Sequence, residues 1–351
     1  MFPSFNNDKV QKDEHGVIYS LDGKRLLDGS NCNCKIYRIR EGTEYVCNYA
    51  FIKPWGMKKN LEKIIFPSTL IYIPTSAIPD NCSIHSISPN YSVINDLLID
   101  TRKKCVIKCL NKHIQKAEIY EPIEEIGENA FRSFGDNSHG FGQRLMEYLI
   151  LPQSLKKLGK GAFEDAGIRA IYIAGPQTIS ERCFQGSGLR KVILGDNVKT
   201  IENVAFGSCS RLEKVVFGRN IKVIGDWAFD YCLSLKKVVF PDSLEKIGKS
   251  AFGGCGCLTN IEIPDSVTEI GENAFSKCKD LKKVKIGKGL TAIPECCFSN
   301  CSKLNEIIIP DTVIQIAQNA FKNCSNFTII GNIGSSAEQF AKENNIKFEA
   351  I

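Results

Sequence analysis

The feature that most constrains the fold of this chain is a unit of 23 residues that is repeated six times in succession. Every copy has a phenylalanine at one position, an isoleucine five residues before it and a cysteine three residues after it. A unit this short has no second layer in which to bury its apolar side chains, so it is stable only when neighbouring copies stack on it. The period therefore predicts a solenoid, with the phenylalanines as its repeated key position: Phe206, Phe229, Phe252, Phe275, Phe298 and Phe321.

Each copy also contains a leucine followed by two apolar residues at strand spacing, as in Leu235, Val238 and Phe240. Residues two apart on a strand point to the same face, and a stack of such strands makes a parallel sheet. Repeats of roughly 20 to 29 residues with this strand are typical of leucine-rich repeat proteins. We therefore predict an α/β-type leucine-rich repeat solenoid of about eleven coils, a right-handed stack whose parallel sheet forms the concave face.

The phenylalanine and cysteine columns are predicted to be core. Replacing one of these phenylalanines with alanine should cost roughly 3–5 kcal/mol of stability. Six of the 16 cysteines stand in the 23-residue ladder, where neighbouring side chains point the same way. A disulfide needs its two Cβ atoms turned toward each other, so we expect buried free thiols, which suit a reducing compartment.

The two ends of the chain depart from the regular unit. Residues 16–27 predict a β-hairpin that turns at Asp22 and Gly23, and residues 91–107 predict a second inserted hairpin that turns between Asp100 and Lys104. We predict degenerate repeats with two inserted β-hairpins in residues 1–130, the regular solenoid in residues 131–326 and a cap in residues 327–351, all in one continuous domain.

The predicted cap begins with a pattern that opens helices. Ser335 and Glu338 fit a capping box, in which each side chain accepts a hydrogen bond from the first turn of a helix. Phe340 and Ala341 follow at the spacing needed to cover the last coil. An open final coil would expose apolar side chains and strand edges, so a solenoid needs such an end.

The repeated unit resembles that of one known family. The segment from Leu258 to Cys278, LTNIEIPDSVTEIGENAFSKC, is similar to the BspA-like (treponemal-type) leucine-rich repeat, and the likeness extends over residues 16–351. The resemblance implies a non-enzymatic bacterial protein at the cell surface or secreted, which binds host matrix, other bacteria or partner proteins. The first residues of this chain show no apolar leader, so we expect a cytoplasmic protein if Met1 is the native start.

Few residues in the sequence suggest catalysis or metal binding. No serine or cysteine has a base partner at a recognisable spacing, and we predict no catalytic residues and no cofactor. Cys105, Cys109 and His113 have a ligand-like spacing, and Cys32 and Cys34 stand in another loop, but packing in the inserts explains them better than a metal. A net charge of +6 does not indicate nucleic acid, and no apolar run is long enough to span a membrane. We expect a monomer.

The better candidate for function is the face of the sheet that points away from the coil. The residue between the two buried positions of each strand projects there, and in the middle of the chain it is apolar: Ile150, Tyr172, Ile193, Val216 and Val239. Two positions earlier comes a mostly basic column: Lys191, Lys214, Lys237 and Lys283. An exposed apolar strip beside lysines is typical of a binding surface. A structural explanation also stands, because β-branched residues favour strands and lysines keep a sheet soluble.

The sequence thus favours a protein-interaction scaffold that binds a protein partner, acidic at its rim, on the concave face. The alternative is a cell-surface adhesin that binds host matrix or a polyanionic carbohydrate through the lysine column. The loop from Gly135 to Gly142, which includes His139, is a further contact candidate, because inserted loops often carry function.

Overall fold

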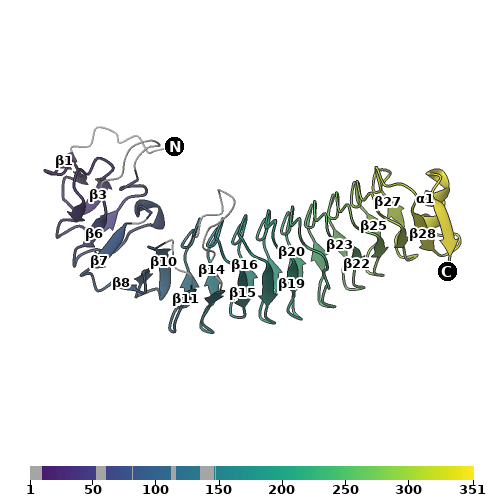
Figure 1. Cartoon of the computed structure of the whole chain (residues 1–351), viewed down its shortest axis with the longest axis horizontal. Coiled ribbons are helices and arrows are strands. Elements are labelled where there is room, and N and C mark those ends of the chain that lie inside the picture. Colours follow the sequence, from purple (N-terminus) through teal and green to yellow (C-terminus); the bar gives the residue numbers. More distant parts are fainter. Residues whose placement is uncertain (1–9, 53–60, 81, 112–115, 135–145, 147) are drawn as a thin grey trace. The chain divides into compact units, whose positions relative to one another are not determined.

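The structure is a computed structural model that describes residues 10–52, 61–80, 82–111, 116–134, 146 and 148–351. The chain is a β-solenoid of about 13 turns with parallel sheets, and the described residues contain one α-helix, at the C-terminal end (Figure 1). The predicted fold class is confirmed. The sequence predicted about eleven coils, and the structure has more because turns such as that of strand β7 (Ser83–Ser86) have no phenylalanine in the repeated column.

The chain divides into two compact units. The first holds residues 1–113 and 123–130, and the second holds residues 114–122 and 131–351. The domain boundaries that the sequence suggested, at residues 130 and 326, stay a prediction.

The first unit opens with the predicted hairpin. Strands β1 (Val10–Lys12), β2 (Ile18–Ser20) and β3 (Arg25–Asp28) pair antiparallel, and Gly23 N donates to Ser20 O at 2.9 Å in the turn. β3 then pairs parallel with β5 (Tyr45–Val46). A parallel sheet follows, formed by β4 (Ile36–Arg38), β6 (Lys63–Phe66) and β7, and the 3₁₀ helix η1 spans Thr75–Ala77.

The second predicted hairpin is also present. Strands β9 (Leu97–Asp100) and β10 (Cys105–Cys109) pair antiparallel, and β10 pairs parallel with β12 (Glu125–Ile126). The structure adds a strand that the sequence did not predict, β8 (Tyr91–Ile94), which pairs antiparallel with β9. Its turn uses Asn95 and Asp96, both left-handed, with φ of 49° and 60°.

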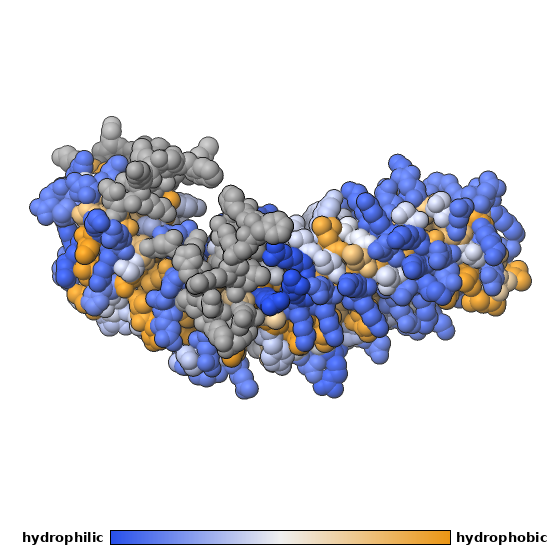
Figure 2. All heavy atoms as spheres, viewed as in Figure 1, coloured by the Kyte–Doolittle hydropathy of each residue, from blue (hydrophilic) through white to orange (hydrophobic). Residues whose placement is uncertain are grey.

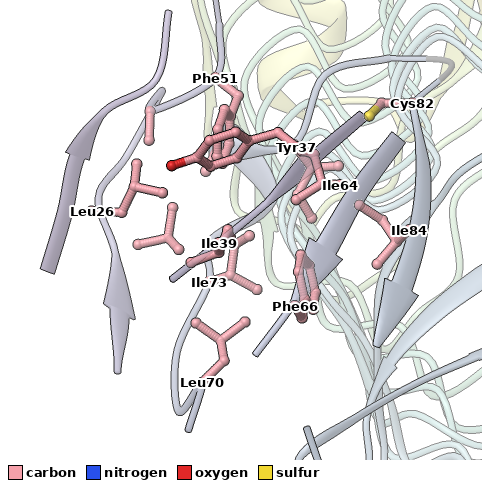
Figure 3. Close-up of a cluster of buried hydrophobic side chains, with 14 of the residues drawn as sticks. Leu26, Tyr37, Ile39, Phe51, Ile64, Phe66, Leu70, Ile73, Cys82 and Ile84 are labelled. Atoms are coloured by element: carbon pink, nitrogen blue, oxygen red, sulfur yellow. The ribbon is translucent and has the colours of Figure 1, made fainter. Parts of the chain in front are cut away.

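The core of the first unit is a cluster of aromatic and aliphatic side chains. Tyr37, Phe51 and Phe66 lie buried between its strands (Figure 3). The Tyr37 hydroxyl donates to Asp13 Oδ2 at 2.6 Å and also contacts the Tyr19 hydroxyl, so two buried polar groups are satisfied.

In the second unit, strands of successive coils pair in parallel and in register (Figure 1). One sheet contains β11 (Lys116–Glu118), β13 (Tyr148–Ile150), β15 (Ala170–Ile173), β17 (Lys191–Leu194) and β19 (Lys214–Val216). Another contains β22 (Asn260–Glu262), β24 (Lys283–Lys285), β26 (Glu306–Ile308), β28 (Thr328–Gly331) and β29 (Lys347–Ala350).

The rest of each coil carries a second, two-residue strand and a turn segment with the key phenylalanine. The short strands are β14 (Lys157–Leu158), β16 (Thr178–Ile179), β18 (Thr200–Ile201), β20 (Val223–Ile224), β21 (Lys246–Ile247), β23 (Glu269–Ile270), β25 (Ala292–Ile293) and β27 (Gln315–Ile316). Backbone bonds also join the turn segments, as where Phe206 N donates to Ala228 O at 2.8 Å. Neighbouring coils are thus joined by backbone bonds at three places.

The phenylalanines form one continuous stack through the core of the second unit. The Phe206 and Phe229 rings lie 5.1 Å apart at 6°, and the Phe229 and Phe252 rings lie 5.2 Å apart at 7°. The stack runs from Phe131 to Phe321 with centroid distances of 5.0 Å to 5.7 Å. These distances lie in the range in which aromatic pairs add stability beyond the area they bury.

All 16 cysteines are free thiols, which confirms the prediction made for the six of the ladder. Those of the ladder lie beside the phenylalanine stack. Each donates its thiol hydrogen to the backbone oxygen of the key phenylalanine in the preceding coil, as Cys255 does to Phe229 O at 3.2 Å. The cysteine column therefore contributes donors between coils as well as packing volume.

The C-terminal cap has the predicted form. Helix α1 (Ser336–Glu343) begins where Ser335 Oγ accepts a hydrogen bond from Glu338 N at 3.3 Å. Phe340 and Ala341 are buried, and the Phe340 ring lies 5.9 Å from that of Phe321, so the helix covers the last coil. Within the described residues, no helix has the length and apolar character needed to cross a membrane.

Candidate functional site

Four of the five apolar residues singled out in the sequence lie on the outward face of the first parallel sheet of the second unit, and Val239 follows at the same position in the next coil, beyond the last strand of that sheet. We call this row the apolar strip. Tyr172 lies beside Ile193, and Ile193 lies beside Val216 in the strand register. Four members are exposed, with Tyr172 at 58% and Val239 at 67%, while Ile193 is half-buried. The complete strip is Ile150, Tyr172, Ile193, Val216 and Val239.

Three of the predicted lysines form a second row on the same face, which we call the lysine row. Lys191 lies directly beside Lys214, and Lys214 lies beside Lys237. All three side chains are exposed. Among the residues that the structure describes, none of these ammonium groups has a carboxylate within 4.0 Å. Strands in register are about 4.8 Å apart, so three like charges stand close together without compensation.

The fourth predicted lysine lies in a different electrostatic setting. Lys283 Nζ is 2.9 Å from Glu306 Oε1 in the next coil, and on the same strand Lys285 Nζ is 2.5 Å from Glu262 Oε1. The Glu262 carboxylate raises the pKa of Lys285 above its ordinary value. Lys283 therefore belongs to a part of the face where charges are paired between coils.

The two parts of this face meet where the sheet is interrupted. Beyond β19 the ladder continues only as a bridge between Lys214 and Lys237, and β22 begins a separate sheet. The inner strand position is occupied here by Phe217 and Phe240, where the neighbouring coils have Leu194 and Ile263. The Phe217 and Phe240 rings lie 6.1 Å apart, against 5.2 Å between the key phenylalanines of the same two coils. The sheet is thus interrupted where two bulky rings occupy the inner strand position of successive coils.

A hollow of about 900 Å³ adjoins the interruption, and sequence reasoning missed it. Lys237 and Val239 line it at one end, and Glu262, Lys285 and Ile308 line it on the separate sheet. The one sequence feature that could have indicated this hollow is the phenylalanine at the inner strand position of two successive coils. The hollow is continuous with the apolar strip, because both contain Val239.

Hydrophilic residues cover much of the visible face of the second unit, with hydrophobic residues in patches between them (Figure 2). Exposed apolar residues also occur singly elsewhere, such as Ile314 at 77%. Single residues of this kind are normal on soluble proteins. The apolar strip differs because its members occupy the same position in five successive coils.

The other candidates from the sequence lie partly outside the described residues. The loop from Gly135 to Gly142, with His139, lies outside the described residues, and so does His113. The thiol of Cys109 contacts Asn111 O at 3.4 Å, and the sulfur atoms of the pair Cys32 and Cys34 lie 3.2 Å apart. Within the described ranges, no three histidine, cysteine, aspartate or glutamate side chains are grouped as metal ligands would be.

The coil stack, the parallel sheets and the capping helix define a leucine-rich repeat protein. The family model described as the BspA type leucine-rich repeat region matches residues 30–138, 136–256 and 222–346, and the chain belongs to this family. No curated protein matches the sequence.

Several solved bacterial structures are similar to this chain. A leucine-rich repeat protein from Bacteroides ovatus has a TM-score of 0.58 and 20% identity over 99% of this chain and 100% of its own. The pneumococcal vaccine antigen PcpA has a TM-score of 0.58 and 14% identity over 98% of this chain and 99% of its own. The Treponema pallidum protein TpLRR has a TM-score of 0.42 and 20% identity over 74% of this chain and 94% of its own. At these identities the likeness to the first two structures supports the fold alone.

Proposed function

We propose that this chain is a non-enzymatic interaction scaffold that binds a protein partner through the apolar strip and the lysine row. The observation that carries the proposal is their register: a row of mostly exposed apolar side chains runs beside three lysines that have no ion-pair partner among the residues the structure describes. Further along the same face, Lys283 and Lys285 are paired with carboxylates. The positive charge of the lysine row is therefore left for an acidic partner.

The arrangement resembles a protein interface in its composition. Burying exposed apolar surface contributes about 25 cal/mol per Å², and the residues at the centre of an interface contribute most. Val216 and Ile193 stand at the centre of the apolar strip, with Lys214 beside them. Paired rim charges contribute mainly to association rate and specificity, which suits a lysine row at the edge of the strip.

The test is a double substitution on this face. Val216→Asp combined with Lys214→Glu should weaken binding of a protein partner at least tenfold, because it places two acidic groups where the partner is apolar or acidic. A matched control exchanges the charges of a pair on the separate sheet, Glu262→Lys with Lys285→Glu, and should leave affinity within about twofold. Unchanged affinity of the first variant would show that the partner binds elsewhere.

A second candidate is binding of a polyanionic carbohydrate by a cell-surface adhesin, and the lysine row is the observation that favours it. The salt dependence of binding distinguishes the two candidate functions. Binding of a sulfated oligosaccharide through three lysines should weaken steeply between low and physiological salt, because it releases counterions. Binding of a protein partner also uses the apolar strip, so it should weaken less with salt, and Val216→Asp alone should weaken it at least tenfold.

A further inference from the structure

The geometry points to the kind of element that the partner presents: we propose that the apolar strip and the lysine row receive an amphipathic α-helix, laid across the strands, with an acidic stripe next to its apolar stripe. This inference rests on the proposed function and narrows it. It follows from three properties of the face, namely which backbone groups it offers, how its side chains are spaced and how its charge is distributed.

The first property is that the paired strands of this face offer no free backbone hydrogen-bonding groups. The strands β15, β17 and β19 pair with one another, so the amide and carbonyl groups of the inner strands are already used. A partner on this face therefore meets side chains only. An extended chain lying across the strands would leave its own backbone groups unpaired against the apolar strip, and each such buried group is costly. An α-helix satisfies its backbone internally.

The second property is the spacing along the rows. Neighbouring strands are about 4.8 Å apart, so the outer members of the lysine row, Lys191 and Lys237, stand about 9.6 Å apart. Two turns of an α-helix advance about 10.5 Å over seven residues, which matches this separation. In an extended chain, successive residues on the same face are about 6.7 Å apart, and this spacing does not match the strand spacing of about 4.8 Å along the two rows. The strip from Ile150 to Val239 crosses four strand intervals, about 19 Å, the length of roughly 13 helical residues.

The third property is the charge. The lysine row lies two residues from the apolar strip along each strand, as Lys214 does from Val216, so both rows face the same side. They are about 6.7 Å apart, and a helix of about 10 Å diameter covers both. Glutamate or aspartate residues at seven-residue spacing, next to the apolar stripe, would face Lys191 and Lys237 at its ends. A helix with a basic stripe would meet three uncompensated ammonium groups.

A display library of random 20-residue peptides tests this proposal. The library is selected on the full-length protein and then depleted on two variants, Val216→Asp and the triple variant Lys191→Glu, Lys214→Glu and Lys237→Glu. These positions are exposed, so both variants should fold, and circular dichroism and thermal unfolding verify it. We expect the retained peptides to have apolar residues at helical spacing with acidic residues on one flank, and to gain helix content on binding.

A charge exchange then tests the register directly. One retained peptide is synthesised with its central acidic residue changed to lysine. Against the wild-type protein the change should weaken binding at least tenfold, and against Lys214→Glu it should restore most of the loss. A version of the peptide with proline at its centre should bind at least tenfold more weakly, because proline breaks the helix.

The outcomes separate the helix proposal from the proposed function. Peptides that depend on the strip but alternate apolar and polar residues, lack acidic enrichment or tolerate the central proline would overturn the helix and leave the binding face intact. If the peptides selected on the wild type all bind both variants equally well, so that none survives the depletion, the face is not a binding surface, and the helix proposal fails with it.

Discussion

Cys232 donates its thiol hydrogen to the backbone oxygen of Phe206, which lies one coil earlier, with 3.3 Å between sulfur and oxygen. The same bond recurs throughout the ladder, from Cys209 to Phe184 O at 3.0 Å as far as Cys324 to Phe298 O at 3.0 Å. Each thiol thus joins the two most regular columns of the repeat across a coil boundary.

Replacing Cys232 with alanine should lower the free energy of unfolding by about 2 kcal/mol, because it leaves a small cavity and removes a buried donor. Urea denaturation measures the change. Cys257, which is only half-buried and stands outside the ladder, is the matched control, and its alanine variant should change stability by less than about 0.5 kcal/mol. Equal effects at the two positions would contradict a role for the ladder.

The buried thiols should make the protein sensitive to alkali. Burial raises the pKa of Cys209 and of Cys278 from 9.0 to about 12. The unfolded chain loses these protons above pH 9, while the folded chain keeps them to about pH 12. Their contribution to stability is therefore complete below pH 9 and falls by about 1.4 kcal/mol per pH unit for each thiol between pH 9 and pH 12.

Urea denaturation at pH 8, 9, 10 and 11 measures this slope. The double variant Cys209→Ala with Cys278→Ala should be less stable than the wild type at pH 8 but should lose stability more slowly above pH 9. Parallel curves for the two proteins would show that other groups, such as tyrosines, cause the alkaline loss.

One turn residue is held in an unfavourable backbone conformation. Two residues before five of the six key phenylalanines, all except Phe321, the backbone is left-handed, and at Val204 φ is 59°. This region is costly for a β-branched residue, whereas Asn273 occupies the equivalent position with φ of 58°. Val204→Asn should therefore raise the free energy of unfolding by about 1 kcal/mol. The reverse exchange, Asn273→Val, should lower it by a similar amount, and two changes of the same sign would argue against this strain.

The interruption of the sheet should depend on the two phenylalanines at its inner face. Phe217→Leu combined with Phe240→Ile gives these coils the residues of their neighbours and should let the ladder continue to β22. Hydrogen exchange of the amides of residues 237–240 should then slow at least tenfold, because paired strand amides exchange only on opening. The control Ile263→Leu with Ile286→Leu alters the same position in later coils and should leave these amides unchanged. Fast exchange in both variants would place the cause elsewhere.

The sequence was sufficient for the features that depend on a local pattern repeated at a constant interval. The phenylalanine stack, the free thiols, both hairpins and the serine cap of α1 all follow from spacing within one coil or one turn. The second half of the predicted capping box does not form, because the Glu338 carboxylate accepts a hydrogen bond from Gly334 N at 2.6 Å and not from Ser335 N. The strand β8 was missed because its turn uses Asn95 and Asp96 in left-handed conformations without a glycine. The outward position of Tyr172 and Val216 followed from strand alternation, and both are exposed as expected.

What the sequence missed depends on neighbours in the next coil. The interruption beyond Lys237 coincides with a ring contact between two coils, and the hollow adjoins it. Whether a lysine of this face is paired with a carboxylate depends on the residue 23 positions away. Glu306 stands at this interval from Lys283, whereas Lys214 stands at this interval from Lys191. A comparison of positions one period apart could have found this division, but a coil considered alone could not.

The central claim is that a protein partner covers the apolar strip and the lysine row, and differential lysine labelling tests it most directly. An amine-reactive reagent is applied to the protein alone and in complex with a partner trapped by a photoreactive residue at position 172, and modification at each lysine is measured by mass spectrometry. The account predicts at least fivefold protection of Lys191, Lys214 and Lys237, with Lys279 and Lys322 unchanged. Full labelling of the three lysines in the complex would contradict it.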